Sequence, residues 1–172
     1  FSVRLEEYLS DPEELGRIVA EAILERAIRP PLKKAGIGFD VWTSEHRDIR
    51  LKGLVEKALR ELSRLGHTYE KDGAVWLKTT PFGDDKDRVL MRSKEEGGGP
   101  TYAAVDIPYH LEKWKRGYDI LINIWGADHQ GHVSRMKAVA TALGIDPGRL
   151  QIIIAQMVTL KRGEEVVKIS KR

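Results

Sequence analysis

Cysteine is absent from the 172 residues of this chain, and this absence excludes disulfide-linked scaffolds and thiolate metal sites. Long apolar runs are absent too: no run approaches the ~20 residues that a membrane-spanning helix needs, and no stretch resembles a signal peptide. We therefore expect a protein of the reducing cytoplasm with no membrane partner.

An excess of charge of one sign is also lacking. The chain has 29 Lys and Arg against 26 Asp and Glu, which gives a net charge of +3 and an isoelectric point of about 9.1. This balance permits a polyanionic partner without requiring one. With 41% hydrophobic residues, the chain can bury one sizeable core. It opens on Phe1 rather than methionine and stops at "KISKR", so we expect a piece of a larger protein.

The first part of the chain, residues 1–36, is predicted to be helical. In "SDPEELGRIVAEAILERAI" the apolar residues repeat on one helical face, and Ser10 and Glu13 have the spacing of a capping box. Next come residues 37–52. Here "GIGFDVW" has the short apolar and aromatic run of a strand, and "TSEHRD" follows as a loop.

Residues 53–99 have the pattern of a small α+β unit. A helix is predicted because six apolar residues share one face, and Gly66 then offers a C-terminal cap. The six are Leu51, Leu54, Val55, Ala58, Leu62 and Leu65. A hairpin turning at Asp72–Gly73 and a third strand at "DRVLMRS" complete a small antiparallel sheet. The acidic turn at Asp84, Asp85 and Asp87 lacks the spacing of a calcium loop, so we interpret it as solvated. The glycines of "KEEGGGP" mark a join.

Residues 100–172 follow a different pattern, that of a βαβ unit. "PTYAAVDIPYHLEKWKRG" is helical in pattern despite Pro108, and the apolar strands "YDILINIW" and "LQIIIAQMVTL" flank a helix ending at Gly144. Fully apolar strands joined by a helix predict a parallel sheet covered on both faces. Ligands bind beyond the carboxyl ends of such strands, where Gly126 to His132 and Met157 to Leu160 are expected.

The polar residues Asp128, His129 and His132 at the end of the first apolar strand have three interpretations. They could bind zinc, but no cysteine or fourth ligand accompanies them, so we expect no metal site. Asp128 could cap the following helix. Alternatively, the helix N-terminus could bind a nucleotide, with Gly126 allowing close approach and Asp128 accepting a hydrogen bond from a ribose. The other histidines lack catalytic partners in the sequence, and we interpret them as surface or satisfied residues.

The basic segment "KISKR" has two interpretations. Lys168 and Lys171 flank Ser170 and offer mobile positive charges for phosphate groups. Short basic runs are also common as solvated turns. The position of this run, soon after the second apolar strand, favours phosphate binding, because it places the run beside the predicted ligand crevice.

Together these motifs resemble a known family. "GADHQGH" followed by "VKISKR" resembles the second half of the catalytic domain of class I aminoacyl-tRNA synthetases. The stretches "YEKDGAVWLKTTPFGDDKDRVLMRS", "PTYAAVDIPYHLEKWKRGYD" and "INIWGADHQGHVSRMKA" are similar to arginyl-tRNA synthetases. The resemblance implies an α/β fold, a partial Rossmann-like parallel sheet with a small inserted α+β segment. Residues 53–99 correspond to the insert and residues 100–172 to the second half of the Rossmann-like domain.

The resemblance also implies an activity. Arginine would be activated by ATP with Mg²⁺, in a step that needs the tRNA, and then transferred to tRNA(Arg) in the cytoplasm, with no DNA partner. Lys168, Ser170 and Lys171 match the family's catalytic phosphate loop. The ATP-binding positions would be Gly126, Asp128, His129 and His132 together with the two lysines.

A guanidinium is planar and permanently charged, so a fixed carboxylate recognises it best. Tyr102 and Asp106 are four residues apart, on one helical face, and they match the family's arginine pocket. His129 and Glu45 are further candidates for arginine contact. Taken without the resemblance, Asp106 reads as an N-cap, since Pro108 suits the first turn of a helix starting there.

One signature of the class is missing: no His-Ile-Gly-His-like element occurs in these residues. Two hypotheses therefore stay open. The chain is either a segment of an arginine–tRNA ligase, inactive alone, or a non-catalytic nucleotide-binding domain that keeps the fold. A small metal-dependent enzyme using Asp128, His129 and His132 is a third.

Overall fold

The computed structural model describes residues 11–156 and 158–167. They belong to two compact units, one ending at Asp48 and the other starting at Ile49. The division of the chain into the four predicted segments stays a prediction. Among the described residues, no helix combines the length and the hydrophobicity that crossing a membrane requires.

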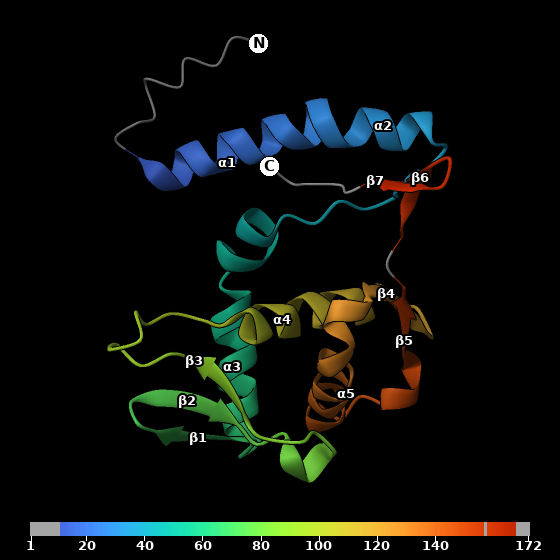
Figure 1. Ribbon diagram of the computed structural model, residues 1–172. Coiled ribbons are helices and arrows are strands. Elements are labelled where there is room, and N and C mark those ends of the chain that lie inside the picture. Colours follow the sequence, from blue (N-terminus) through green and yellow to red (C-terminus); the bar gives the residue numbers. More distant parts are fainter. Residues whose placement is uncertain (1–10, 157, 168–172) are drawn as a thin grey trace. The chain divides into compact units, whose positions relative to one another are not determined.

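The first unit consists mainly of one helical stretch (Figure 1). α1 (Pro12–Ile23) continues through a π-helical turn, η2 (Leu24–Ile28), into α2 (Arg29–Lys34). Asp11 is the N-cap and accepts a hydrogen bond from the Glu14 backbone N–H at 3.0 Å. The predicted capping box is therefore wrong by one residue, because Pro12 suits the first helical position and leaves the cap to its predecessor. Ser10 itself lies outside the described residues.

The predicted strand at residues 36–42 does not form. These residues are irregular, and a second π-helical turn, η3 (Glu45–Arg50), follows them. A strand needs a hydrogen-bonding neighbour, and none pairs with this stretch among the described residues. Phe39 and Trp42 instead stack edge to face with ring centroids 5.1 Å apart, and Arg29 lies 4.8 Å over the Trp42 ring.

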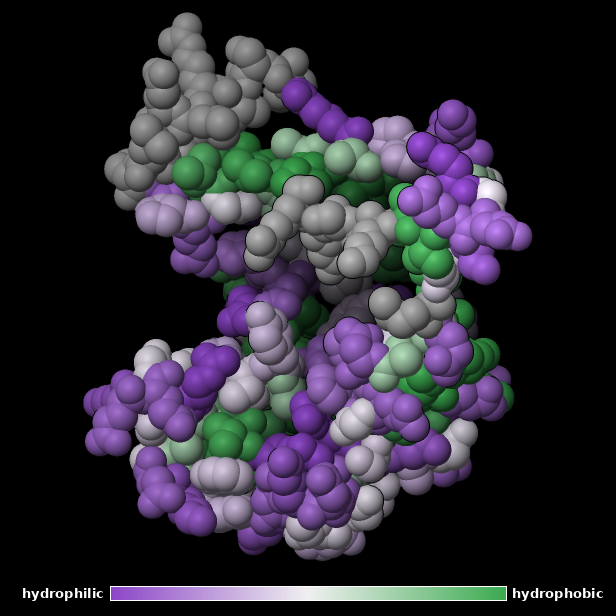
Figure 2. Space-filling model, in the orientation of Figure 1, coloured by the Kyte–Doolittle hydropathy of each residue, from purple (hydrophilic) through white to green (hydrophobic). Residues whose placement is uncertain are grey.

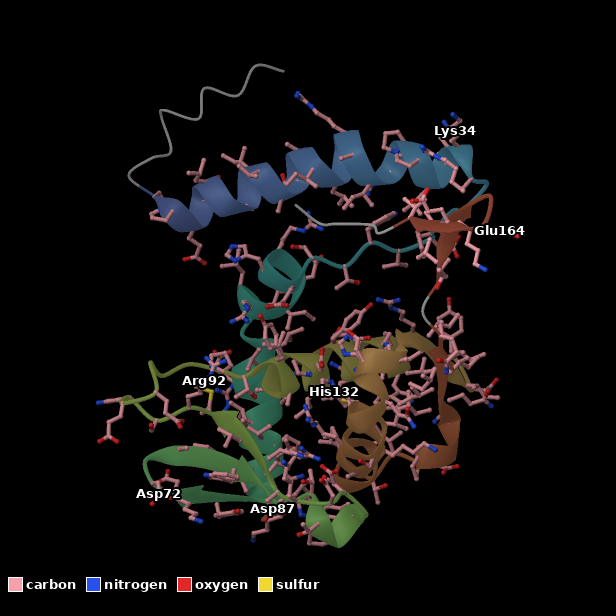
Figure 3. The ribbon with its side chains drawn as sticks, viewed as in Figure 1. Lys34, Asp72, Asp87, Arg92, His132 and Glu164 are labelled. Carbon is pink, nitrogen blue, oxygen red and sulfur yellow. The ribbon has the colours of Figure 1, made fainter. Side chains whose placement is uncertain are left out.

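The second unit starts with the predicted insert. α3 (Leu54–Arg64) buries Val55, Ala58 and Leu62, and Gly66 follows its end with a φ of +76°. β1 (Thr68–Lys71), β2 (Ala74–Leu77) and β3 (Arg88–Met91) form an antiparallel sheet in the order β1-β2-β3. Asp72 and Gly73 both have positive φ, as a tight hairpin turn requires, and Figure 3 shows Asp72 in this turn. Helix, hairpin and third strand are confirmed.

The rest of the second unit is the predicted βαβ arrangement. α4 (Tyr102–Trp114) precedes β4 (Leu121–Gly126), and a 3₁₀ turn, η5 (Ala127–His132), leads into α5 (Val133–Ala142). β5 (Leu150–Ala155) pairs with β4 in parallel, so the parallel sheet is confirmed with two strands. A hairpin of β6 (Leu160–Arg162) and β7 (Glu165–Val167) follows.

The parallel pair is covered on one face only. Leu121 and Leu150 are buried against Met136 of α5, and Asn123 is buried against His110 of α4. Ile122, Ile124 and Ile153 on the other face are 58%, 71% and 50% exposed. Figure 2 shows hydrophobic surface on the side where β5 lies. The prediction of a sheet covered on both faces is therefore wrong for the described residues. Apolar residues on both faces of a strand indicate that burial of both faces would be favourable. A face is buried only where a second layer of structure covers it.

The main core of the second unit joins the insert to the rest of the unit. Its buried side chains come from the end of η3 and from α3, β2, β3, α4 and α5: Ile49, Val55, Ala58, Leu62, Leu77, Leu90, Ala104, Val105, Ile107, Val139 and Ala142. A smaller cluster of Leu121, Met136 and Leu150 lies between α5 and the parallel pair. The insert and the βαβ arrangement consequently share one hydrophobic core.

Candidate functional site

The carboxyl end of the parallel pair holds the residues on which the nucleotide hypothesis depends. Gly126 is aligned with Ala155 across the two strands, so both strands end at one edge. The η5 turn starts at this edge and carries Asp128, His129 and His132. The sequence predicted this position correctly, because a parallel strand leading into a helix puts the connecting turn at the carboxyl edge.

Gly126 and Asp128 lie in close contact. A Cβ atom added at Gly126 would meet the Asp128 Oδ1 atom at 2.6 Å, so glycine allows the carboxylate to fold back over the strand end. Gly126 is the N-cap of η5, and no side chain caps this turn. The interpretation of Asp128 as a helix cap is therefore wrong. Its side chain is 75% exposed and available to a ligand.

The two histidines of the turn contact each other edge to face. Their ring centroids are 5.3 Å apart, and their ring planes are nearly perpendicular. His129 Nε2 lies 3.6 Å from Asp128 Oδ2. Burial, followed by the positive charge of Arg135, lowers the pKa of His132, and this favours its neutral form. Within the described part of the chain, no group of three His, Asp or Glu residues could hold a metal ion.

Tyr102 and Asp106 lie on the exposed face of α4. The helix starts at Tyr102, capped by the Thr101 hydroxyl, which accepts a hydrogen bond from the Ala104 N–H. The interpretation of Asp106 as an N-cap is therefore wrong, since this residue lies in the second turn. Tyr102 is 80% exposed and Asp106 is also exposed, so a phenol and a carboxylate face outward one helical turn apart.

The candidates on α4 and those of the η5 turn are related electrostatically through Arg135, near the start of α5. Burial lowers the pKa of Arg135 on α5, and so does the charge of Arg88, whereas Asp84, Asp106 and Asp85 raise it. Asp106 of α4 and the start of α5 are thus within electrostatic reach of each other. Figure 3 shows His132 where η5 meets α5.

The remaining candidates belong to the first unit or lie outside the described residues. Glu45 is exposed and belongs to the first unit, in the η3 turn. Lys168, Ser170 and Lys171 lie outside the described residues, as does Met157. Their placement stays a prediction.

A buried polar network that the sequence did not reveal connects α4 to β4. The Asn123 amide accepts a hydrogen bond from Lys113 Nζ at 2.8 Å and donates one to His110 Nε2 at 2.7 Å. The other ring nitrogen, Nδ1, then carries the proton and donates to the Asp106 carbonyl at 2.9 Å. His110 was predicted to be a surface or a satisfied histidine, and it is a buried, satisfied one. Its partner could not be read from the sequence, because the two residues come from different elements.

No family model matches the chain. Individual proteins match it closely. It is 49% identical over 160 residues to the arginine–tRNA ligase of Carboxydothermus hydrogenoformans, which covers 93% of this chain and 28% of that protein. It is 48% identical over 165 residues to the arginine–tRNA ligase of Desulforudis audaxviator. This chain matches one segment of arginyl-tRNA synthetases. It spans under a third of the length of these curated relatives.

A solved structure supports the same conclusion for the fold. A crystal structure described as an arginyl-tRNA synthetase, from Campylobacter jejuni, superimposes with a TM-score of 0.80 at 37% identity, over 95% of this chain and 37% of that one. The predicted fold class, a partial Rossmann-like α/β arrangement with a small insert, is confirmed. None of the relatives named here favours the alternative of a non-catalytic nucleotide-binding domain.

Proposed function

We propose that this chain is a segment of an arginine–tRNA ligase that carries part of the ATP site and part of the arginine site. One observation carries this proposal: the continuous match, at 49% identity over 160 residues, to a protein of that name. The segment includes the strand end, the η5 turn and the exposed face of α4, where every described candidate except Glu45 lies.

The adenosine of ATP would bind at the η5 turn. Backbone N–H groups at the end of a parallel strand favour polar and anionic ligands. Gly126 lets the Asp128 carboxylate lie against the strand end, and this exposed carboxylate can accept hydrogen bonds from ribose hydroxyls. A neutral His132 can contact the nucleoside without adding charge. His129, beside Asp128, would face the boundary between the adenylate and the amino acid.

The arginine side chain would bind over α4. Asp106 provides the negative charge that a guanidinium needs, and the Tyr102 phenol adds a flat surface and an oxygen on the same face. Glu45, in the first unit, is a further candidate for arginine contact on the strength of the sequence alone.

Lys168 and Lys171, with Ser170 between them, would bind the phosphates of ATP. Magnesium would enter as the Mg·ATP complex, that is, as part of the substrate, since Mg²⁺ is held largely by phosphate oxygens and water. A carboxylate oxygen of arginine attacks the α-phosphorus and pyrophosphate leaves. A ribose hydroxyl of tRNA(Arg) then attacks the activated carbonyl carbon, and AMP leaves. Mobile positive charges stabilise the negative charge that develops on the phosphates.

Pyrophosphate exchange into ATP tests the proposal directly. A longer polypeptide that contains this chain should exchange pyrophosphate only when arginine and tRNA are both present. The 172-residue chain alone should not exchange pyrophosphate. Catalysis by positioning fails when one phosphate-binding motif is missing, and these residues contain no His-Ile-Gly-His-like element. Arginine-independent exchange, or exchange driven by a different amino acid, would contradict the assignment. Ligases of this kind act where translation occurs, so we propose a cytoplasmic location.

Replacing Gly126 by alanine is expected to weaken ATP binding with little loss of stability. The added Cβ would displace the exposed Asp128 carboxylate, which can swing into solvent at small cost. Loss of one ribose hydrogen bond to a charged group predicts a roughly tenfold higher KM for ATP. The matched control is Gly131→Ala in the same turn, where a Cβ meets nothing within 4 Å. Equal KM values for ATP in both variants would show that Asp128 is not part of the ATP site.

A further inference from the structure

Asp84 is a buried carboxylate that the sequence analysis interpreted as solvated, and the structure corrects this. Its side chain has an exposure of 0%. Arg88 donates two hydrogen bonds to it, from Nε at 2.6 Å and from Nη2 at 2.8 Å. The backbone N–H of Asp85 donates a third at 3.0 Å, and the hydroxyl of Ser134 donates a fourth at 2.9 Å.

These contacts hold the carboxylate in its charged form. Burial alone raises the pKa of Asp84, but the hydrogen bonds from Arg88, Ser134 and Asp85 outweigh it and keep the pKa well below the usual range. Arg88 is 12% exposed and also pairs with Asp85. A buried carboxylate with a bidentate arginine has little freedom to move, since any displacement leaves a charge unpaired.

The fourth hydrogen bond joins two parts of the fold. Asp84 and Arg88 belong to the insert, just before and at the start of β3, whereas Ser134 is the second residue of α5. The two ends of this bond are 50 residues apart in the sequence. Ser134 follows the η5 turn at once, so the bond fixes the helix start to which His132 and Asp128 are attached.

We propose that Asp84 is a positioning residue: through Ser134 it fixes the η5 turn at the carboxyl end of β4, so that the insert determines the geometry of the ATP site. The proposal rests on the function proposed above. Asp84 and Ser134 touch no substrate in this account. β4 holds the turn from one side, and the Asp84–Ser134 bond holds it from the other, which restricts how Asp128 and the histidines can reorient.

Ser134→Ala tests the bond with little risk to folding. Ser134 is exposed, so the variant removes only the hydroxyl and leaves the Asp84–Arg88 pair in place. Ser63→Ala is the matched control, an exposed serine on α3 whose hydroxyl makes no hydrogen bond to the described residues. Ser134→Thr retains the hydroxyl and should restore the wild-type behaviour.

Hydrogen exchange of the backbone amides in η5 and the first turn of α5 is the readout that does not depend on activity. We expect exchange there to be roughly tenfold faster in Ser134→Ala than in the wild type and in Ser63→Ala. Exchange in β2 and β3 should be unchanged. Equal rates at residues 128–134 in all variants would overturn the proposal.

Kinetics on a longer polypeptide that contains this chain provide the second readout. Ser134→Ala should raise the KM for ATP roughly tenfold, leave the KM for arginine unchanged, and be rescued by Ser134→Thr. If the wild type shows no arginine-dependent exchange, the proposed function fails, and the hydrogen-exchange result alone decides the role of Asp84. If the wild type is active and the ATP constants of Ser134→Ala and Ser63→Ala agree, the positioning role is wrong although the function stands.

Discussion

Asparagine in place of Asp106 is expected to raise the KM for arginine by roughly 10- to 100-fold while leaving the KM for ATP nearly unchanged. The substitution keeps the size of the side chain and removes the charge that we propose faces the guanidinium. A hydrogen bond to a charged group contributes about 1.5 to 3 kcal/mol, which corresponds to that range. Asp106 lies in the second turn of α4 and is not its cap, so the helix should be unaffected. Steady-state pyrophosphate exchange would measure both constants.

Two further variants sharpen this test. Asp119→Asn is the matched control, because Asp119 is also exposed and its side chain has no hydrogen bond or ion pair among the described residues. Lys171→Ala should show the opposite pattern, a lower kcat with little change in arginine binding, since its charge is needed when the phosphates reorganise. An unaltered arginine KM in Asp106→Asn, accompanied by a lower melting temperature, would make Asp106 a structural residue and leave the substrate assignment to similarity alone.

Acidification is expected to destabilise the chain through His110. Burial, reinforced by the charge of Lys113, lowers the pKa of this histidine from 6.5 to about 4. Its Nε2 atom accepts a hydrogen bond from Asn123, so a proton added there would face another N–H group. The unfolded chain binds this proton below pH 6.5 and the folded chain only below about pH 4. This contribution to stability is therefore complete above pH 6.5 and is lost as the pH falls from 6.5 to 4.

The size of this effect follows from the two pKa values. The difference between 6.5 and about 4 corresponds to about 3 kcal/mol in the free energy of unfolding. Urea unfolding at a series of pH values between 4 and 7 would measure it. His110→Gln should be less stable at pH 7 than the wild type, yet it should lose less stability on acidification. Parallel pH profiles for the wild type and His110→Gln would refute the assignment.

Much of the local structure could be predicted because local sequence specifies it. The Asp72–Gly73 turn needs positive φ at both residues, and Gly66 and Gly144 take the left-handed conformation that ends α3 and α5. The apolar run before Gly126 predicted a parallel strand, and hence the position of the η5 turn. Each of these predictions depends on residues close together in the chain.

Predictions that depended on absent or distant partners were wrong. The strand predicted at residues 36–42 has no neighbour to pair with among the described residues, and the outer face of the β4–β5 pair has no covering layer there. Asp84 looked solvated because its sequence neighbours are charged, although its spacing of four residues from Arg88 was a signal for a pair. Ser134, the partner that gives Asp84 its proposed role, is 50 residues away.

The sequence by itself determined the helices, the turns, the parallel strand pair and the candidate residues at the end of β4 and on α4, because hydrophobic periodicity and backbone preference act over a few residues. Only the tertiary structure decided which polar groups are buried and what satisfies them. Asp84 with Arg88 and Ser134, and His110 with Asn123 and Lys113, are examples. A buried charge or imidazole is stable only where the fold brings a partner to it, and that partner can come from any part of the chain.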